Sequence, residues 1–316
     1  MLTNAHDDES GLKSEHMDIE MCETLMQIKQ NMLGFDHFFG SWVSQGEINI
    51  VVDAGPASAA AGLVESLDAM GVTTVDYVFL THLHIDHCGG LAELLDHYPM
   101  AKVICHENGL KYLPDPSKLW TASLAALGDV AEAYGPPKPV AKERIIPHKE
   151  SNLKDLVVLE TPGHAAHHLS FSYRNRLFAG EAGGNYLVVD GTEYLRPATP
   201  PRFFFDVCVQ SIDKLLSMED QPIYYAHFDR AESSHRLLRM FRDQLMQWKR
   251  VIYDQMQKGN DDLVRRCMDT LLAKDPNLKA FESMDTYAKK RERFFMVNSI
   301  KGFIGFFMRQ PKRMQR

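Results

Sequence analysis

The sequence lacks the features of several protein classes. It has only five cysteines, an odd number without any CxxC pair, which argues against a disulfide framework and fits a reducing cytoplasm. It has no apolar run of the roughly 18 residues that a membrane-spanning helix needs. The first twenty residues have neither a basic start nor an apolar core, so we do not expect a secretory signal. We therefore predict a cytoplasmic protein without membrane contact.

The sequence also has no excess of basic over acidic residues. Acidic residues number 42 and basic residues 35, which gives a formal net charge of −7. Proteins that bind nucleic-acid phosphates usually have a basic surface, so nucleic acid is not an expected partner. The 45% of hydrophobic residues is ordinary for a globular protein and excludes a disordered chain. Fourteen histidines in 316 residues are many, which directs attention to metal sites.

Short apolar runs alternate with helical spacing along the first 230 residues. We predict buried strands at 48–52, 77–80, 102–105, 155–160, 169–173, 176–179 and 222–226, and helices at 57–70, after Gly90, and at 117–133. Residues 1 to about 30 are expected to be a frayed tail or a first edge strand. This alternation indicates an α/β fold.

The pattern changes after residue 230, where apolar residues recur three or four apart. Helices are predicted within 237–252, 263–272 and 294–308. We therefore divide the chain into a catalytic domain over residues 1–230 and a helical C-terminal extension over residues 231–316. The last helix is expected to cover the mouth of an active site or to form a face of a homodimer.

The segment THLHIDHCGG, residues 81–90, follows a predicted strand and contains four potential metal ligands within six residues. Alternate residues just past a strand end point to one side, so His82 and His84 can converge on one ion. Asp86 and His87 follow at a bend and can face a second ion. Imidazole and carboxylate groups suit zinc, iron or manganese. The alternative is a polar loop whose histidines are satisfied by hydrogen bonds.

Further ligands are needed from elsewhere for two ions. TPGHAAHH contains His164, RLFAGEAGG contains Glu181 and YYAHFD contains His227, each at the end of a predicted strand, where α/β folds place their sites. Each of these residues is weak evidence when taken singly. In combination with the HxHxDH motif, and in this order, they form a strong pattern.

These motifs, with VVDAG at 51–55, resemble those of metallo-β-lactamase-fold proteins of the hydrolase type, such as glyoxalase II and the lactonases. The resemblance covers about residues 35–230 and implies a four-layer αββα sandwich. It also implies a role for each ligand position. The first metal would be bound by His82, His84 and His164, the second by Asp86, His87 and His227, and Asp53 would orient the ligand loop. The helical extension resembles that of the bacterial quinolone-signal response protein.

The position of Glu181 departs from this family pattern, in which the bridging ligand is usually Asp. The extra methylene could let Glu181 bridge two metals, bind only one, or swing away to admit substrate. Glu181 could also be a nearby carboxylate that binds no metal. We expect two divalent ions, zinc first, with iron or manganese as alternatives.

The resulting functional prediction is a hydrolase of small-molecule esters, lactones, thioesters or phosphoesters, in which a metal-bound hydroxide attacks and Asp86 is the partner of the water proton or of the leaving group. The alternatives are a mononuclear-iron persulfide dioxygenase and a metal-stabilised regulatory protein with weak residual hydrolysis. Tyr186 and Arg196 are candidate substrate-binding residues. The simpler alternatives are a core tyrosine and a structural ion pair.

Overall fold

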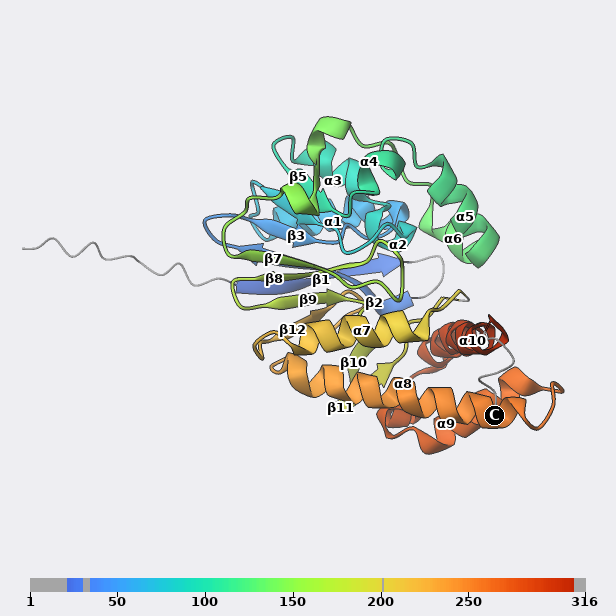
Figure 1. Ribbon diagram of the computed structural model, residues 1–316. Coiled ribbons are helices and arrows are strands. Elements are labelled where there is room, and N and C mark those ends of the chain that lie inside the picture. Colours follow the sequence, from blue (N-terminus) through green and yellow to red (C-terminus); the bar gives the residue numbers. More distant parts are fainter. Residues whose placement is uncertain (1–21, 31–34, 201, 310–316) are drawn as a thin grey trace, which may run out of the picture.

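Two β-sheets lie between two layers of helices in the computed structural model, which describes residues 22–30, 35–200 and 202–309 (Figure 1). Helices from residues 57–134 cover one outer face, and helices from residues 205–309 cover the other (Figure 1). This is the four-layer αββα sandwich with added C-terminal helices that the sequence predicts. Residues 1–21, the larger part of the predicted tail, lie outside the described residues.

The first sheet has six strands in the order β1-β2-β3-β4-β5-β6. Its first three strands pair antiparallel and β3 to β6 pair parallel. The strands are β1 (Cys22–Gln30), β2 (Phe35–Gln45), β3 (Ile50–Val52), β4 (Tyr77–Phe79), β5 (Lys102–Cys105) and β6 (Ile145–Pro147). Parallel pairing needs crossover connections, and helical segments supply them.

The second sheet has five strands in the order β13-β12-β9-β8-β7. A separate two-stranded hairpin is formed by β10 and β11. The strands are β7 (Leu156–Glu160), β8 (Leu169–Tyr173), β9 (Leu177–Gly180), β10 (Asn185–Val189), β11 (Thr192–Arg196), β12 (Ile223–Tyr225) and β13 (Arg230–Ala231).

Helices fill the two outer layers. The first layer has α1 (Ala60–Ala69), α2 (Ile85–Cys88), α3 (Leu91–His97), α4 (Gly109–Tyr112), α5 (Ser117–Leu127) and α6 (Asp129–Tyr134). The second has α7 (Phe205–Leu216), α8 (Ser234–Met256), α9 (Leu263–Lys274) and α10 (Thr286–Arg309). Short 3₁₀ helices are η1 (Ala57–Ala59), η2 (Lys142–Arg144), η3 (His148–Glu150) and η4 (Pro276–Ser283).

Apolar side chains fill three interfaces between these layers. The faces of the two sheets meet through residues such as Phe79 of β4 and Phe171 of β8, whose rings stack with centroids 4.9 Å apart. A second cluster joins the first sheet to α1 and α3. The third joins the second sheet and the hairpin to α7–α10, with Trp248 fully buried in it.

The division of the chain at residue 230 stays a prediction. No helix in the described ranges combines the length and the apolar character needed to cross a membrane.

The strands and helices that were predicted agree closely in position with those observed, with the differences that follow. The helix predicted at 117–133 is two helices, because Gly128 between them has a φ of +55°. The predictions also lack the strands β2, β6 and β13, the helices α4 and α7, and the hairpin β10–β11. The hairpin has a recognisable turn in Asp190–Gly191, where both residues have positive φ. The amphipathic spacing of Phe205, Cys208, Ile212 and Leu215 indicates α7.

Candidate metal centre

The loop that follows β4 directs its polar side chains in two directions. Residues 80–84 continue from the strand, and His84 has extended backbone angles at the start of α2. The chain then turns helical, so Asp86 and His87 lie in the single turn of α2. This change of backbone conformation separates His82 and His84 from Asp86 and His87, as the spacing of the motif predicts.

Three more polar side chains reach the same place from the second sheet. His164 lies in the loop between β7 and β8, Glu181 directly follows β9, and His227 follows β12 by two residues. These residues are far apart in the chain. They meet the loop after β4 because the two sheets face each other with these strand ends at one edge of the sandwich.

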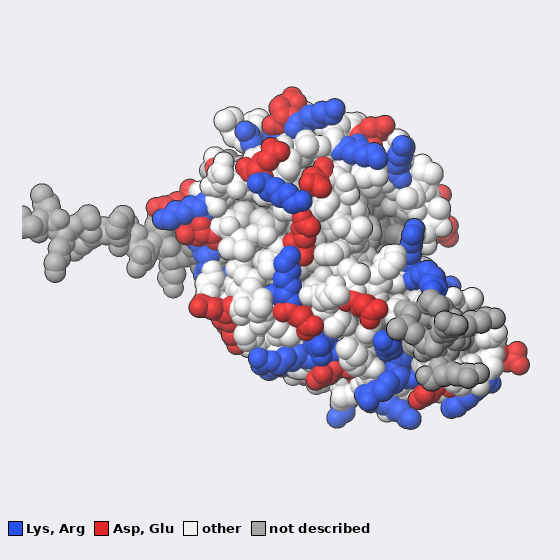
Figure 2. All heavy atoms as spheres, in the orientation of Figure 1, with Lys and Arg blue, Asp and Glu red and all other residues white. Residues whose placement is uncertain are grey.

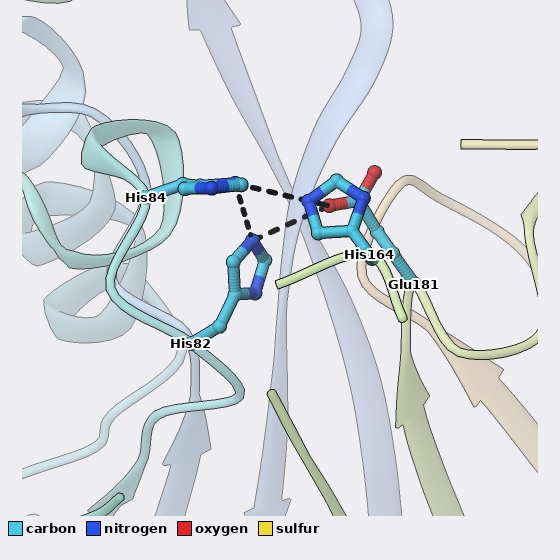
Figure 3. Close-up of side chains that lie close together, drawn as sticks. All are labelled: His82, His84, His164 and Glu181. Carbon is cyan, nitrogen blue, oxygen red and sulfur yellow. Dashed lines mark hydrogen bonds and ion pairs between the residues drawn. The ribbon is translucent and has the colours of Figure 1, made fainter. Parts of the chain in front are cut away.

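Four side chains form the first group, namely His82, His84, His164 and Glu181, with potential ligand atoms within 4.8 Å of one another. Figure 3 shows the three imidazoles and the carboxylate pointing toward a common centre. Nδ1 of His84 lies 3.0 Å from Nε2 of His82 and 2.9 Å from Nε2 of His164. Oε2 of Glu181 lies 2.8 Å from Nε2 of His164.

Asp86, His87 and His227 form a second group of the same compactness. Glu181 lies between the two groups. Its Oε1 is 3.4 Å from Nε2 of His227, whereas its Oε2 faces the first group and is also 3.6 Å from Nε2 of His87. Its two carboxylate oxygens therefore face different groups, despite the additional methylene. The structure brings together all seven side chains that the sequence selects as metal ligands.

Hydrogen bonds on the outer side of four imidazoles fix which nitrogen faces the centre. In each case Nδ1 meets an oxygen acceptor, so Nε2 is the nitrogen that faces the centre. The acceptors are the Thr81 hydroxyl for His82 (3.0 Å), the Asp53 carboxylate for His87 (3.0 Å), and the carbonyls of Ala198 for His164 (2.7 Å) and Phe38 for His227 (3.1 Å).

The residues present fit a pair of divalent cations. Among the described residues, buried Nε2 of His87 has no hydrogen-bond partner, which a bound cation would provide. Burial and the neighbouring imidazoles lower the pKa of His82, so that ring is neutral and can donate its lone pair. Burial alone would raise the pKa of Glu181, but His164 and His227 hold it well below its usual range, so the carboxylate is ionised. Neutral imidazole with carboxylate is a donor set suited to zinc, iron or manganese.

Asp53 forms hydrogen bonds that hold the loop after β4 in place. It is 2% exposed and has a φ of +58°, a left-handed conformation that Asp tolerates better than most residues. Its carboxylate accepts hydrogen bonds from the Thr81 N–H (2.8 Å) and hydroxyl (2.8 Å), in addition to His87. These contacts are the structural basis for the orienting role predicted for Asp53.

His168 is a supporting residue that the sequence interpretation missed. Its Nε2 accepts the backbone N–H of Glu181 (3.0 Å), and its Nδ1 lies 2.9 Å from the Thr161 hydroxyl. Gly180 precedes Glu181 with a φ of +59°, and a Cβ there would lie 2.5 Å from Nε2 of His168. The only sequence signal was the histidine pair after His164, which does not indicate which ring turns inward.

A cavity of about 390 Å³ opens above the two groups. Its walls include α5, the loop residues Ala198 to Pro200 and α10. Figure 2 shows the surface indented on the right, between the part of the molecule with α5 and α6 and the part with α10. Tyr134 of α6, which no motif singled out, also lines the cavity. Burial and the charges of Asp86 and Glu181 raise its pKa well above the usual value, so its hydroxyl stays protonated.

The two predicted substrate-binding residues have different positions. Tyr186 is not among the described residues that line the cavity, so its contact with substrate stays a prediction. It is buried against Tyr225, and its hydroxyl donates to Glu193 (2.8 Å). Arg196 does line the cavity, but its guanidinium forms an ion pair with buried Glu292 of α10. The structural ion pair, the simpler alternative for Arg196, is therefore present.

Asn185 connects this ion pair to the metal ligands. With its amide nitrogen toward the centre, it donates to Oε1 of Glu181 (3.2 Å), and its oxygen accepts from Nη2 of Arg196 (3.1 Å). Asn185 also lines the cavity. This residue was not selected from the sequence, where it is only one of several polar residues after the AGEA motif.

Residues 41–227 match the model of the metallo-beta-lactamase superfamily. The chain belongs to this superfamily. The metallo-beta-lactamase fold-containing protein ST1585 of Sulfurisphaera tokodaii is 30% identical over 216 residues, which are 65% of this chain and 78% of that protein. A hydroxyacylglutathione hydrolase of Xanthomonas campestris pv. campestris is 29% identical over 170 residues, 54% of this chain and 53% of the enzyme. The chain thus matches about half the length of that hydroxyacylglutathione hydrolase.

Solved structures show the same fold. The archaeal metallo-beta-lactamase superfamily protein ST1585 from Sulfolobus tokodaii has a TM-score of 0.65 at 23% identity, covering 90% of this chain and 98% of that one. The metallo-beta-lactamase family protein TTHA1429 from Thermus thermophilus has a TM-score of 0.59 at 19% identity, covering 91% and 93%. These similarities extend beyond residue 230, so the superfamily fold with its C-terminal helices has precedent.

Proposed function

We propose that this superfamily member is a binuclear metal-dependent hydrolase of small-molecule esters, lactones, thioesters or phosphoesters. The observation that supports the proposal most strongly is the position of Glu181. Its Oε2 is 2.8 Å from Nε2 of His164 and its Oε1 is 3.4 Å from Nε2 of His227, so one carboxylate faces both groups. A lone metal site would not need this arrangement.

Each group supplies the donors for one cation. The first ion would be held by His82, His84 and His164, and the second by Asp86, His87 and His227, with Glu181 shared. Zinc is the first candidate, with iron or manganese as alternatives for these donors. When bound, such ions lower the pKa of water to near neutrality and polarise a substrate oxygen.

The chain's own residues complete the chemistry. Asp86 has its carboxylate at the cavity floor, 3.8 Å from Nε2 of His227, where it can accept a proton from the nucleophilic water or return one to the leaving group. The protonated hydroxyl of Tyr134 is a hydrogen-bond donor in the same cavity. Apolar walls exclude water around the reacting groups and strengthen their electrostatic interactions.

The relatives also favour hydrolysis. The hydroxyacylglutathione hydrolase from Xanthomonas campestris bears the name of a hydrolase. At 29% identity over about half that enzyme, this supports the reaction class and leaves the substrate to experiment.

The test is elemental analysis of the purified protein together with hydrolysis of a panel of esters, lactones, thioesters and phosphodiesters. We expect about two equivalents of metal per chain and hydrolysis that chelation abolishes and added metal restores. His84→Ala and Asp86→Ala should each lose activity by at least 100-fold. The control is His97→Ala, because His97 is a half-exposed histidine paired with Asp68 outside the site.

Undiminished hydrolysis in His84→Ala would contradict the proposed mechanism. A different result would be one equivalent of iron per chain, oxygen consumption with a persulfide substrate, and no hydrolysis of any compound in the panel. That result would replace the hydrolase proposal by an oxygenase. A metal-bearing protein inactive on every substrate would favour a regulatory role.

A further inference from the structure

One wall of the active-site cavity is a single uncharged face of α5. The residues of α5 that line the cavity recur three or four apart and are Leu119, Ala122, Ser123, Ala126 and Leu127. This spacing places them along one side of the helix. The lysine of α5, Lys118, is exposed and does not line the cavity.

The opposite wall comes from α10 and is also uncharged. Phe295, Asn298 and Ser299 line the cavity from α10, and Phe38 of β2 lies against Phe295 with ring centroids 4.9 Å apart. The floor near the metal groups includes Leu83 and Ile85. A ligand bound between the two helices would therefore contact mainly hydrocarbon surface on its way to the metal groups.

Outside the seven candidate metal ligands, Arg196 is the one residue with a permanent charge among the described residues that line the cavity. It is 1% exposed, and its nitrogens are already used. Nε bonds to Glu292, Nη1 to the carbonyl of Pro197 (3.3 Å), and Nη2 to the oxygen of Asn185 (3.1 Å). Glu292 is shared with Arg291, whose Nε donates to the same carboxylate (2.9 Å), so a bound anion would meet a guanidinium whose three nitrogens already have protein partners.

His167 is a further ionisable side chain that lines the cavity, and if protonated it could pair with an anionic substrate. Its Nδ1 accepts the backbone N–H of Leu83 (3.2 Å), which requires an unprotonated nitrogen and therefore a neutral ring. The described wall thus contains no positive group without protein partners that would pair with a carboxylate or phosphate on the part of a substrate remote from the metals.

We infer that the substrate is an uncharged ester, lactone or thioester whose aliphatic acyl chain lies against the uncharged face of α5. This inference rests on the proposed function and specifies the substrate class of that site. An anionic conjugate would lose hydration in this cavity without gaining an ion pair, which is costly. An acyl chain would instead gain about 0.8 kcal/mol per buried methylene, or about fourfold in binding.

The first experiment uses the full-length, metal-containing protein and p-nitrophenyl esters from acetate to octanoate. We expect kcat/KM to rise about fourfold per methylene until the cavity is filled. A matched pair of octanoyl thioesters separates charge from chain length: the neutral N-acetylcysteamine thioester should be preferred to the glutathione thioester, which has carboxylates.

Variants of α5 test where the chain lies. Ala126→Phe narrows the cavity and should lower the octanoate-to-acetate ratio of kcat/KM at least tenfold. Ala125→Phe is the matched control, because Ala125 is an exposed neighbour on α5 that does not line the cavity. It should leave the ratio unchanged. Ala122→Arg introduces a cation into the wall and should shift preference toward the glutathione thioester.

Calorimetric binding of methyl alkyl ketones, which have the chain but no leaving group, separates this inference from the proposed hydrolysis. If no ester is hydrolysed but ketone affinity rises with chain length and falls in Ala126→Phe, the binding of an uncharged alkyl chain at α5 stands and the hydrolase proposal fails. Esters hydrolysed at rates independent of chain length, preference for the glutathione thioester, or ketones that do not bind would overturn the substrate class while leaving hydrolysis intact.

Discussion

Oδ2 of Asp53 lies 3.0 Å from Nδ1 of His87, and both side chains are buried. The carboxylate holds the Nδ1 proton of His87. Nε2 of the same ring therefore faces the centre of the second group, and it has no hydrogen-bond partner among the described residues. Asp53 therefore determines the orientation of His87, a potential metal ligand, through the ring nitrogen that points away from the metal groups.

We predict that Asp53→Asn weakens binding of the second metal by about 10- to 100-fold, because one of the two carboxylate oxygens that accept from Thr81 and His87 becomes an amide nitrogen, which cannot accept. Asparagine is a suitable probe, since it tolerates the positive φ at this position. Titration against a competing chelator measures the affinity. Asp68→Asn is the control, because Asp68 forms a 3.0 Å pair with His97 at the surface. Equal metal affinities in the two variants would contradict the role of Asp53.

The buried pair between Arg196 and Glu292 is predicted to hold α10 against the hairpin. Glu292→Gln should lower the free energy of unfolding by about 3–5 kcal/mol, because it leaves the buried Arg196 charge with too little compensation. Urea denaturation measures this loss. Glu193→Gln, which breaks the more exposed pair with Arg236, should cost no more than about 1 kcal/mol. Similar losses in both variants would contradict a special role for the buried pair.

The same carboxylate predicts a pH dependence of stability. Burial by itself would raise the pKa of Glu292, but Arg196 and Arg291 together lower it below the ordinary value. A depressed pKa in the folded state means that the stabilisation is present above the unfolded value, about 4.3, and is lost as pH falls toward the folded value. The stability difference between the wild type and Glu292→Gln should therefore shrink below about pH 4.3 in urea titrations. A difference independent of pH would contradict this assignment.

Gly180 is predicted to tolerate no side chain. Gly180→Ala introduces a strained positive φ, which costs about 1–2 kcal/mol, and also places a Cβ against the His168 ring that holds Glu181. Gly191→Ala is the matched control, because Gly191 has a φ of +75° and open space around it. Thermal unfolding should show a larger loss for Gly180→Ala, together with weaker metal binding. If both variants lose the same stability and bind metal normally, the contact with His168 is unimportant.

Much of the fold and most of the site could be predicted from local sequence patterns. The alternation of buried strands and helices follows from hydrophobic periodicity, which short segments determine largely by themselves. The HxHxDH motif places four potential ligands on one loop, so their proximity needs no long-range information. His164, Glu181 and His227 could be selected because each follows a predicted strand, and strand ends meet at one edge of the sandwich.

The hairpin limited what could be predicted about substrate contacts. In a strand, successive side chains point to opposite faces. Asn185 and Tyr186 are consecutive in β10, and Asn185 faces Glu181 and the cavity, whereas Tyr186 packs on Tyr225. Because the hairpin was not predicted, the sequence offered no basis for deciding that Asn185 points to the cavity and Tyr186 to the opposite face of the strand.

The sequence by itself thus determined the α/β alternation and the set of seven potential ligands, because periodicity and motif spacing are local properties. Tertiary structure alone decided that Glu181 faces both groups, that Arg196 pairs with Glu292, and that an uncharged helix face borders the cavity. Arg196 and Glu292 are 96 residues apart, and only the packing of α10 against the hairpin brings these charges within reach of each other.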